Sequence, residues 1–211
     1  MQVMILFAVL VLTYLMVIAK RIPALIRGFR YQSFFLFLAT LLAAFNEKQV
    51  DLYLVSGLII LIKVFLIPYF LNRTAKKINV DENLGLFVNS QLSLCSALML
   101  TYCSWMLSGN LGFGRGSLQL AAVSVALSVI FIGAFLMISR MKAFAQVIGI
   151  LVMENGIFLF ASSVSGGMPF FVEIAIFFDV FISVIIMGIF VFRINKLFTH
   201  IDVNKLSQLK G

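Results

Sequence analysis

The stretch Leu118–Ser139, with the sequence LQLAAVSVALSVIFIGAFLMIS, contains no charged residue. An α-helix needs about 20 predominantly apolar residues to cross the hydrocarbon core of a bilayer. The apolar residues form a continuous run, whereas strands of a membrane barrel alternate between apolar and polar residues. The stretch therefore predicts a membrane-spanning α-helix.

Apolar runs of this kind fill most of the chain, which is 63% hydrophobic and 11% charged over 211 residues. A soluble domain could not cover its surface with so few polar groups. We therefore expect an all-α, polytopic transmembrane helical bundle of about seven spans, forming a single integral membrane domain over 1–211. The expected spans are 1–19, 31–45, 52–71, 86–107, 118–139, 144–164 and 169–192. The run at 31–45 is short, so its helix is expected either to be tilted less or to begin earlier, near Gly28.

The positive charges alternate between the two sides of these expected spans. One set of loops contains Lys20, Arg21, Arg27 and Arg30, then Arg73, Lys76 and Lys77, then Arg140 and Lys142, and finally Arg193, Lys196, Lys205 and Lys210. The opposite loops contain Lys48 and Arg115. Lys and Arg favour the cytoplasmic side, so we expect the N-terminus outside and the C-terminus in the cytoplasm. The net charge of +8 is thereby explained by membrane orientation rather than by binding to nucleic acid.

Four ionisable residues lie inside the apolar runs: Lys63, Glu154, Glu173 and Asp179. A charge at the bilayer centre costs roughly 2.5–3.5 kcal/mol on insertion scales, and such residues usually serve ion or proton pathways. At 1.5 Å per residue, Lys63, Glu154 and Asp179 each lie about 15 Å from one end of their helices. Glu173 lies about one turn from the outer edge. This arrangement predicts a mid-membrane row of proton-transfer groups.

Each of these residues also has a structural interpretation. Glu154 and Asp179 could form a static bridge between helices or to a partner subunit, and Lys63 could extend its amine toward the interface. Glu173 could reach the outer interface or cap backbone groups. We expect Asn155 to form hydrogen bonds across a helix interface and Pro68 to favour a kink after Lys63.

Few residues are suited to holding a metal or cofactor. Cys95 and Cys103 share one apolar run, where we expect them to act as small packing residues, and His200 is the only histidine. Zinc and iron–sulfur sites need more ligands than these. We expect no cofactor, no metal site and no independent catalytic residues.

The acidic segments resemble those of the hydrogenase-4 component E family. The resemblance is carried by the stretch Gly149-Ile-Leu-Val-Met-Glu-Asn-Gly156, by Val172-Glu173-Ile174 with Asp179, and by the ending Leu206…Leu209-Lys210-Gly211. Lys63-Val-Phe-Leu-Ile-Pro68 fits the same pattern, so the resemblance runs from about Leu52 to the C-terminus. The region 118–211 is also similar to the three-helix subunit K of NADH–quinone oxidoreductase and to the C subunit of multisubunit cation/proton antiporters. Asp179 matches the later membrane glutamate of subunit K, whereas Glu154 lies one turn after the position of the earlier one, Leu151.

The resemblance implies a subunit without its own catalytic centre in a membrane-bound [NiFe] hydrogenase or formate hydrogenlyase complex of a bacterial or archaeal cytoplasmic membrane. Its implied partners are antiporter-like and hydrogenase-anchoring membrane subunits. Glu154 and Asp179 would carry protons, Lys63 would modulate them, and Glu173 would lie on the outer side. Two alternatives stay open: an assembly subunit whose buried charges hold its neighbours, and a subunit of a cation/proton antiporter.

Overall fold

The computed structural model describes residues 2–47, 50–77, 89–112 and 118–164, and most of these residues are helical. The helices are α1 (Gln2–Ile18), α2 (Ile22–Glu47), α3 (Val50–Leu58), η1 (Ile59–Leu66), α4 (Ile67–Lys77), α5 (Ser90–Asn110), α6 (Leu118–Ser139) and α7 (Ala143–Val164). Five helical segments of this described part are long and apolar enough to cross a membrane: Ile22–Asn46, Leu52–Ala75, Ser90–Asn110, Leu118–Ser139 and Phe144–Val164. The helix α1 is also apolar but shorter. The all-helical class is thus confirmed over these residues.

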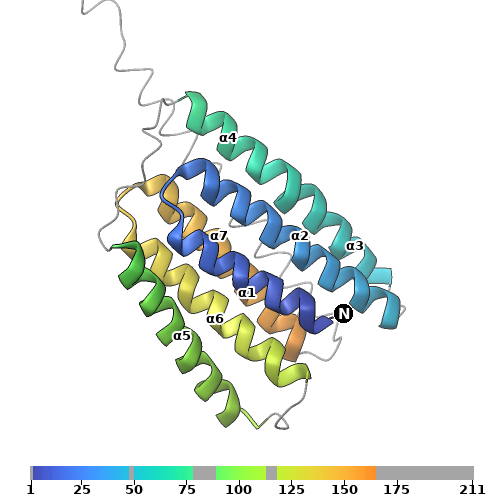
Figure 1. Cartoon of the computed structure of the whole chain (residues 1–211). Coiled ribbons are helices and arrows are strands. Elements are labelled where there is room, and N and C mark those ends of the chain that lie inside the picture. The colour runs from blue at the N-terminus through green and yellow to red at the C-terminus, as the bar shows by residue number, and fades with distance from the viewer. Residues whose placement is uncertain (1, 48–49, 78–88, 113–117, 165–211) are drawn as a thin grey trace, which may run out of the picture.

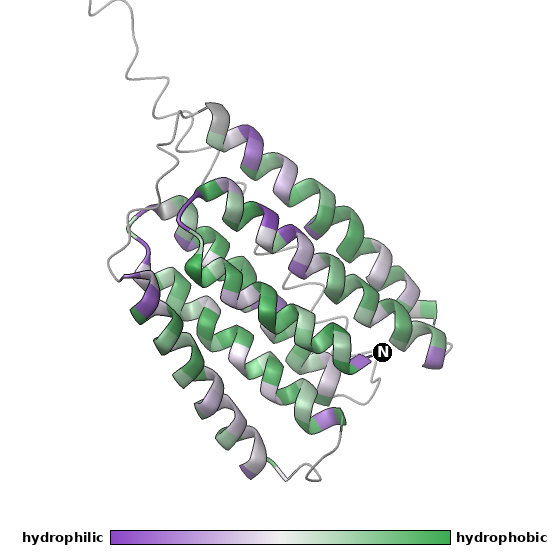
Figure 2. Cartoon of the chain, in the orientation of Figure 1, coloured by the Kyte–Doolittle hydropathy of each residue, from purple (hydrophilic) through white to green (hydrophobic). Residues whose placement is uncertain are grey.

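The helices lie side by side in a bundle (Figure 1). α1 crosses the front between α2 and α6, and α7 lies behind it. α5 forms one edge, and the continuous helix made of α3, η1 and α4 forms the opposite edge. Apolar residues cover most of each helix, and the polar residues gather mainly toward the helix ends (Figure 2). This distribution suits a bundle surrounded by lipid.

The second helix is longer than the apolar run at 31–45 predicts, because α2 already begins at Ile22. Pro23 lies in its first turn, where a missing backbone N–H costs nothing. The helix can include Arg27 and Arg30 because their charged side chains are exposed. The Arg30 guanidinium lies 5.5 Å from the ring centroid of Phe65 on η1. The assignment of Arg27 and Arg30 to a loop was therefore wrong.

The helices α6 and α7 are in close backbone contact at their glycines. A Cβ atom on Gly133 would lie 2.6 Å from the backbone nitrogen of Met153, and one on Gly149 would lie 2.7 Å from that of Met137. Gly156 is equally close to Ile130. Small residues allow such an approach, which is a common way of packing helices within a membrane. The packing fixes the position of α7, the helix that carries Glu154.

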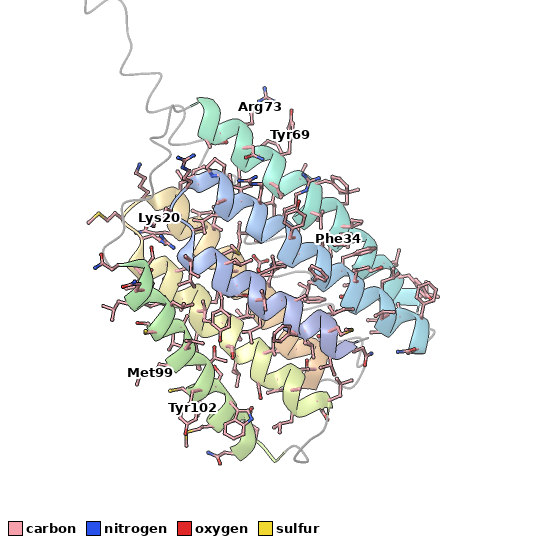
Figure 3. The ribbon with its side chains drawn as sticks, viewed as in Figure 1. Lys20, Phe34, Tyr69, Arg73, Met99 and Tyr102 are labelled. Atoms are coloured by element: carbon pink, nitrogen blue, oxygen red, sulfur yellow. The ribbon has the colours of Figure 1, made fainter. Side chains whose placement is uncertain are left out.

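A buried arginine joins the turn after α1 to the turn after α6. The Nη2 atom of Arg140 donates hydrogen bonds to the carbonyl oxygens of Val17, at 2.6 Å, and Met16, at 3.3 Å. These carbonyls belong to the last turn of α1, where backbone oxygens lack intrahelical donors. Burial lowers the pKa of Arg140 to about 10, so the guanidinium is still cationic at neutral pH. Arg140 thus holds two turns together at the end of the bundle where Lys20 also lies (Figure 3).

The outer surface of α5 is apolar and aromatic. Met99 and Tyr102 point away from the bundle (Figure 3), and Trp105 is also exposed. Cys95 and Cys103 are exposed on the same helix. Their small apolar character makes them equally compatible with a helix face that contacts lipid.

Candidate functional site

Lys63 occupies a helical segment with an unusual hydrogen-bond pattern. It lies on η1, a π-helix in which the backbone N–H of Ile67 bonds to the oxygen of Ile62, five residues earlier. Pro68 follows directly and has no N–H to offer to Val64, so ordinary α-helical bonding cannot pass through this point. Segments of π-helix often occur at functional sites. The π-helical segment lies directly before Pro68 and contains the buried Lys63. The kink expected at Pro68 stays a prediction.

Lys63 and Glu154 face each other inside the bundle. Lys63 is 1% exposed and Glu154, on α7, is 2% exposed. The Nζ atom of Lys63 lies 3.9 Å from Oε1 of Glu154. The Lys63 amine also lies 5.8 Å from the ring centroid of Phe158, one turn after Glu154. Opposite charges in a low-dielectric interior interact strongly at this distance, so the electrostatic states of the two groups are coupled.

Asn155 is the central residue of the polar network around this pair. Its Oδ1 atom accepts a hydrogen bond of 2.9 Å from Nζ of Lys63. Its Nδ2 group donates to Oε1 of Gln32 at 3.1 Å and to Oγ of Ser33 at 3.2 Å. The predicted hydrogen bonding of Asn155 across a helix interface is therefore confirmed, and it joins η1, α2 and α7.

The network continues from α2 into α1. The Nε2 group of Gln32 donates to Oγ1 of Thr13 at 2.8 Å, and the Thr13 hydroxyl donates to the backbone oxygen of Val9 at 2.7 Å. Thr13, Gln32 and Asn155 are almost fully buried. Buried polar groups of this kind are costly unless they are hydrogen-bonded. The described contacts meet that requirement along an unbroken path from Lys63 to α1.

The site places a buried carboxyl group beside a buried amine. A buried carboxyl group beside an ammonium group can change its charge when its surroundings change. Among the described residues, no group of three or more His, Cys, Asp or Glu side chains could hold a metal ion. The combination of one acid, one base and hydrogen-bonding amides fits a proton-handling site.

Comparison with known proteins shows which proteins this chain resembles in sequence. It is 31% identical over 176 residues to hydrogenase-4 component E of Escherichia coli K12, and the alignment covers 82% of this chain and 79% of that protein. The chain belongs to the hydrogenase-4 component E family. The hydrogenase-4 component E of Shigella flexneri shows the same identity and coverage. No family model matches the sequence, and no solved structure matches it either.

A second relative extends the similarity almost to full length. This component E homologue is 26% identical over 203 residues to an uncharacterized protein of Mycobacterium tuberculosis, covering 95% of this chain and 92% of that protein. The family resemblance that the sequence motifs predicted is confirmed. Together with the apolar helices, it makes the chain a multi-pass membrane protein.

The structure describes two of the four predicted proton-transfer residues of this component E homologue. It brings Lys63 and Glu154 together, at 3.9 Å. Glu173 and Asp179 lie outside the described residues, as does the predicted span at 169–192. The four proton-transfer roles remain predictions.

Sequence reasoning missed three members of the network in this component E homologue. Gln32 and Ser33 lie just inside the predicted span at 31–45, and Thr13 lies within the first span. All three were treated as part of apolar runs. An amide side chain within an apolar helix is itself a signal, because it must find a buried partner when the helix enters a membrane. That criterion would have selected Gln32, whereas a threonine can satisfy its own hydroxyl on the preceding turn.

Proposed function

We propose that this protein is an integral membrane subunit, without a catalytic centre of its own, of a membrane-bound [NiFe] hydrogenase or formate hydrogenlyase-type complex. In that complex it takes part in proton translocation, or in coupling redox chemistry to ion movement. The family membership supports the type of complex. The buried Lys63–Glu154 pair supports the proton-handling role.

The single observation that carries the role is the position of Glu154 beside Lys63 within a polar network between apolar helices. In its ionised form the Glu154 carboxylate accepts a proton and becomes a neutral carboxyl group. It then returns to the ionised form by giving the proton up. The amine of Lys63 makes the energy of each state depend on the distance between the two groups.

Glu173 and Asp179 complete the proposed path. Asp179 would be the second mid-membrane carrier, and Glu173 would connect it to the outer side. The region 118–211 would then form a unit like subunit K of NADH–quinone oxidoreductase. We propose seven spans, with the N-terminus outside and the C-terminus in the cytoplasm.

The proposed partners are other membrane subunits of the complex, namely antiporter-like and hydrogenase-anchoring subunits, in a bacterial or archaeal cytoplasmic membrane. This assignment is supported by the membership of the relatives in hydrogenase-4 and by the apolar helices that face outward. The exposed apolar surface of α5 is available to either lipid or another membrane protein of the complex.

Replacement of Glu154 or Asp179 by the corresponding amide tests the proposal. The variants should lose proton translocation while the complex keeps all of its subunits on a native gel. The amide keeps the size of the side chain and removes its ability to carry a proton. Normal proton translocation in both variants would exclude the proposed role.

A second candidate function is structural, and one specific observation favours it. The hydrogen bonds around Asn155 tie together η1, α2 and α7, and those of Gln32 continue to α1. A site of this kind could hold the bundle in the shape that its partner subunits need. In that case the Glu154→Gln variant would lose the assembled complex on the native gel, in addition to proton translocation.

A further inference from the structure

Arg30 lies near the middle of its membrane-spanning helix. It precedes Gln32 by two residues on α2, which corresponds to about 3 Å along a helix. Gln32 accepts a hydrogen bond from Asn155, which lies near the centre of the span Phe144–Val164. Arg30 is therefore close to the centre of the bilayer rather than at its surface.

A contact with an aromatic ring keeps the Arg30 side chain at this depth. The guanidinium lies 5.5 Å from the ring centroid of Phe65, and Phe65 lies near the centre of the span Leu52–Ala75. A long cationic side chain can extend along its helix until the charge reaches the membrane surface. The Arg30 guanidinium instead lies beside a ring in the middle of the neighbouring span.

The side of α2 and η1 that carries Arg30 is opposite to the side that faces α7. Gln32 on α2 and Lys63 on η1 are buried and are hydrogen-bonded to Asn155 on α7. Arg30 lies two residues from Gln32, and Phe65 lies two residues from Lys63, which is about half a helical turn in each case. Both Arg30 and Phe65 are exposed. The guanidinium is thus on the outside of the bundle at mid-membrane depth.

The surroundings of Arg30 on this outer side are aromatic. Phe34 lies one turn after Arg30 on α2, and Tyr69 lies one turn after Phe65 on α4. Both are exposed, and Tyr69 points away from the bundle (Figure 3). Arg30, Phe34, Phe65 and Tyr69 together are called the Arg30 surface below. Arginine and aromatic residues are enriched in protein interfaces and supply much of their binding energy.

Acyl chains cannot neutralise the charge of Arg30. An arginine at the bilayer centre is costly, and such residues face protein or a water-filled cavity. Among the described residues, no carboxylate is placed to pair with it. Glu154 faces Lys63 inside the bundle, Glu47 ends α2, and Asp51 lies in the first turn of α3, far from Arg30 along the helices.

We propose that the Arg30 surface is the contact with a different, neighbouring membrane subunit, which places an Asp or Glu carboxylate against Arg30 near the bilayer centre. The inference rests on the proposed function, because it requires the chain to be one subunit of a membrane complex. A guanidinium and a carboxylate form two parallel hydrogen bonds. The aromatic rings around Arg30 would exclude water and lipid from that pair.

The predicted span at 169–192 of this chain is a less suitable occupant of the Arg30 surface. Residues 165–168 alone separate it from the end of α7, and short connections join helices that are neighbours. The helix α7 is hydrogen-bonded to the opposite side of α2. A partner subunit reaches Arg30 from outside the bundle without this constraint.

Photo-cross-linking in the purified complex tests the contact. Phe65→benzoylphenylalanine and Tyr69→benzoylphenylalanine place a photo-reactive ring on the Arg30 surface. Mass spectrometry after irradiation should find both positions joined to one membrane-spanning segment of another subunit, and that segment should contain an Asp or Glu. Adducts only with phospholipid, with residues 165–211 of this chain or with a second copy of it would overturn the inference.

Arg30→Gln measures what the charge contributes to assembly. It should reduce the fraction of the chain that stays in the complex on a native gel by about fivefold or more, because the partner's carboxylate is left buried and unpaired. Arg27→Gln is the matched control. Arg27 lies about one turn nearer the start of α2, where its side chain can reach the membrane surface, so this variant should change the fraction less than about twofold. Full retention of Arg30→Gln in the complex would contradict the proposal.

Thermal unfolding of the full chain purified alone in detergent separates assembly from folding. Arg30→Gln should leave it unchanged, whereas a clear loss of stability there would place the role of Arg30 within this chain and overturn the inference. Failure of the proposed function gives a different result. Normal proton translocation by Glu154→Gln would exclude the proton-carrying role and would leave the cross-linked partner as it is.

Discussion

Lys63 on η1 and Glu154 on α7 lie opposite each other in the interior of the bundle, with Nζ 3.9 Å from Oε1. Each is at least 98% buried, and each comes from the apolar part of its helix. The pair is close enough for strong electrostatic coupling but too far apart for a direct hydrogen bond.

Removing one charge of the pair should destabilise the protein more than removing both. Lys63→Met leaves Glu154 without this cation and should cost about 3–5 kcal/mol. The double variant Lys63→Met with Glu154→Met should recover a substantial part of that loss, because apolar side chains can replace a buried ion pair. Chemical unfolding of the purified chain in detergent measures Lys63→Met, Glu154→Met and the double variant. Simple addition of the effects of the two single variants would contradict the ion pair.

The close contact between α6 and α7 predicts a position-dependent effect of adding one methyl group. Gly149→Ala would place a Cβ atom 2.7 Å from the Met137 backbone nitrogen, so it should destabilise the protein by about 1–3 kcal/mol. Gly57→Ala is the control, since nothing lies within 4 Å of its Cβ position. Thermal unfolding of the two variants should separate them clearly. Equal stability of the two would mean that α6 and α7 do not approach each other so closely.

The hydrogen bonds of Arg140 at the end of α1 should stabilise the folded protein. Arg140→Gln removes the donor to Met16 and Val17 and should cost about 1–3 kcal/mol. Lys20→Gln, at an exposed position of the same end, should change stability by no more than about 0.5 kcal/mol. Thermal unfolding in detergent compares the two, and a cost for Lys20→Gln as large as that for Arg140→Gln would contradict the capping role.

The same variant has a predictable pH dependence. The pKa of Arg140 is lowered to about 10 by burial, so the folded chain loses this proton before the unfolded chain does. The free energy of unfolding of the unsubstituted protein, minus that of Arg140→Gln, should be constant near neutral pH. This difference should rise as the pH passes above about 10. Unfolding measurements across the alkaline range test this, and a difference that falls there would have the wrong sign.

Replacement of Pro68 should change function without a loss of stability. Pro68→Ala supplies the N–H that could bond to Val64, so η1 should revert toward an α-helix. That change would turn the Lys63 side chain relative to Asn155 and should reduce proton translocation several-fold, while thermal stability stays the same or increases. Proton translocation at the level of the unsubstituted protein would show that the π-helical segment has no role in the site.

The long apolar runs predicted the positions of their helices well, because a run of about 20 apolar residues is enough to cross a membrane. The spans at 118–139 and 144–164 match α6 and α7 to within a residue. The start of α2 was less predictable, because Arg27 and Arg30 lower the average hydropathy of a helix segment whose cations face outward. The exposure of Cys95 and Cys103 could not be predicted either, since a cysteine packs equally well against protein and lipid.

The depth of Lys63 and Glu154 could be estimated from the sequence, but the contact between them could not. Depth follows from the rise per residue, whereas the contact depends on which faces of η1 and α7 meet. The π-helical segment changes the face on which Lys63 lies, and no periodicity in the sequence marks it. Thr13 was missed for a related reason, because its role depends on the position of Gln32 on another helix.

The most direct test of the central claim is the number of protons translocated per hydrogen molecule formed, measured with the purified complex in sealed liposomes. Glu154→Gln should assemble and turn over hydrogen while losing nearly all proton translocation, and Glu154→Asp, which keeps the acid, should retain part of it. An unchanged proton-to-hydrogen ratio in the fully assembled Glu154→Gln complex would contradict a proton-carrying role for this site.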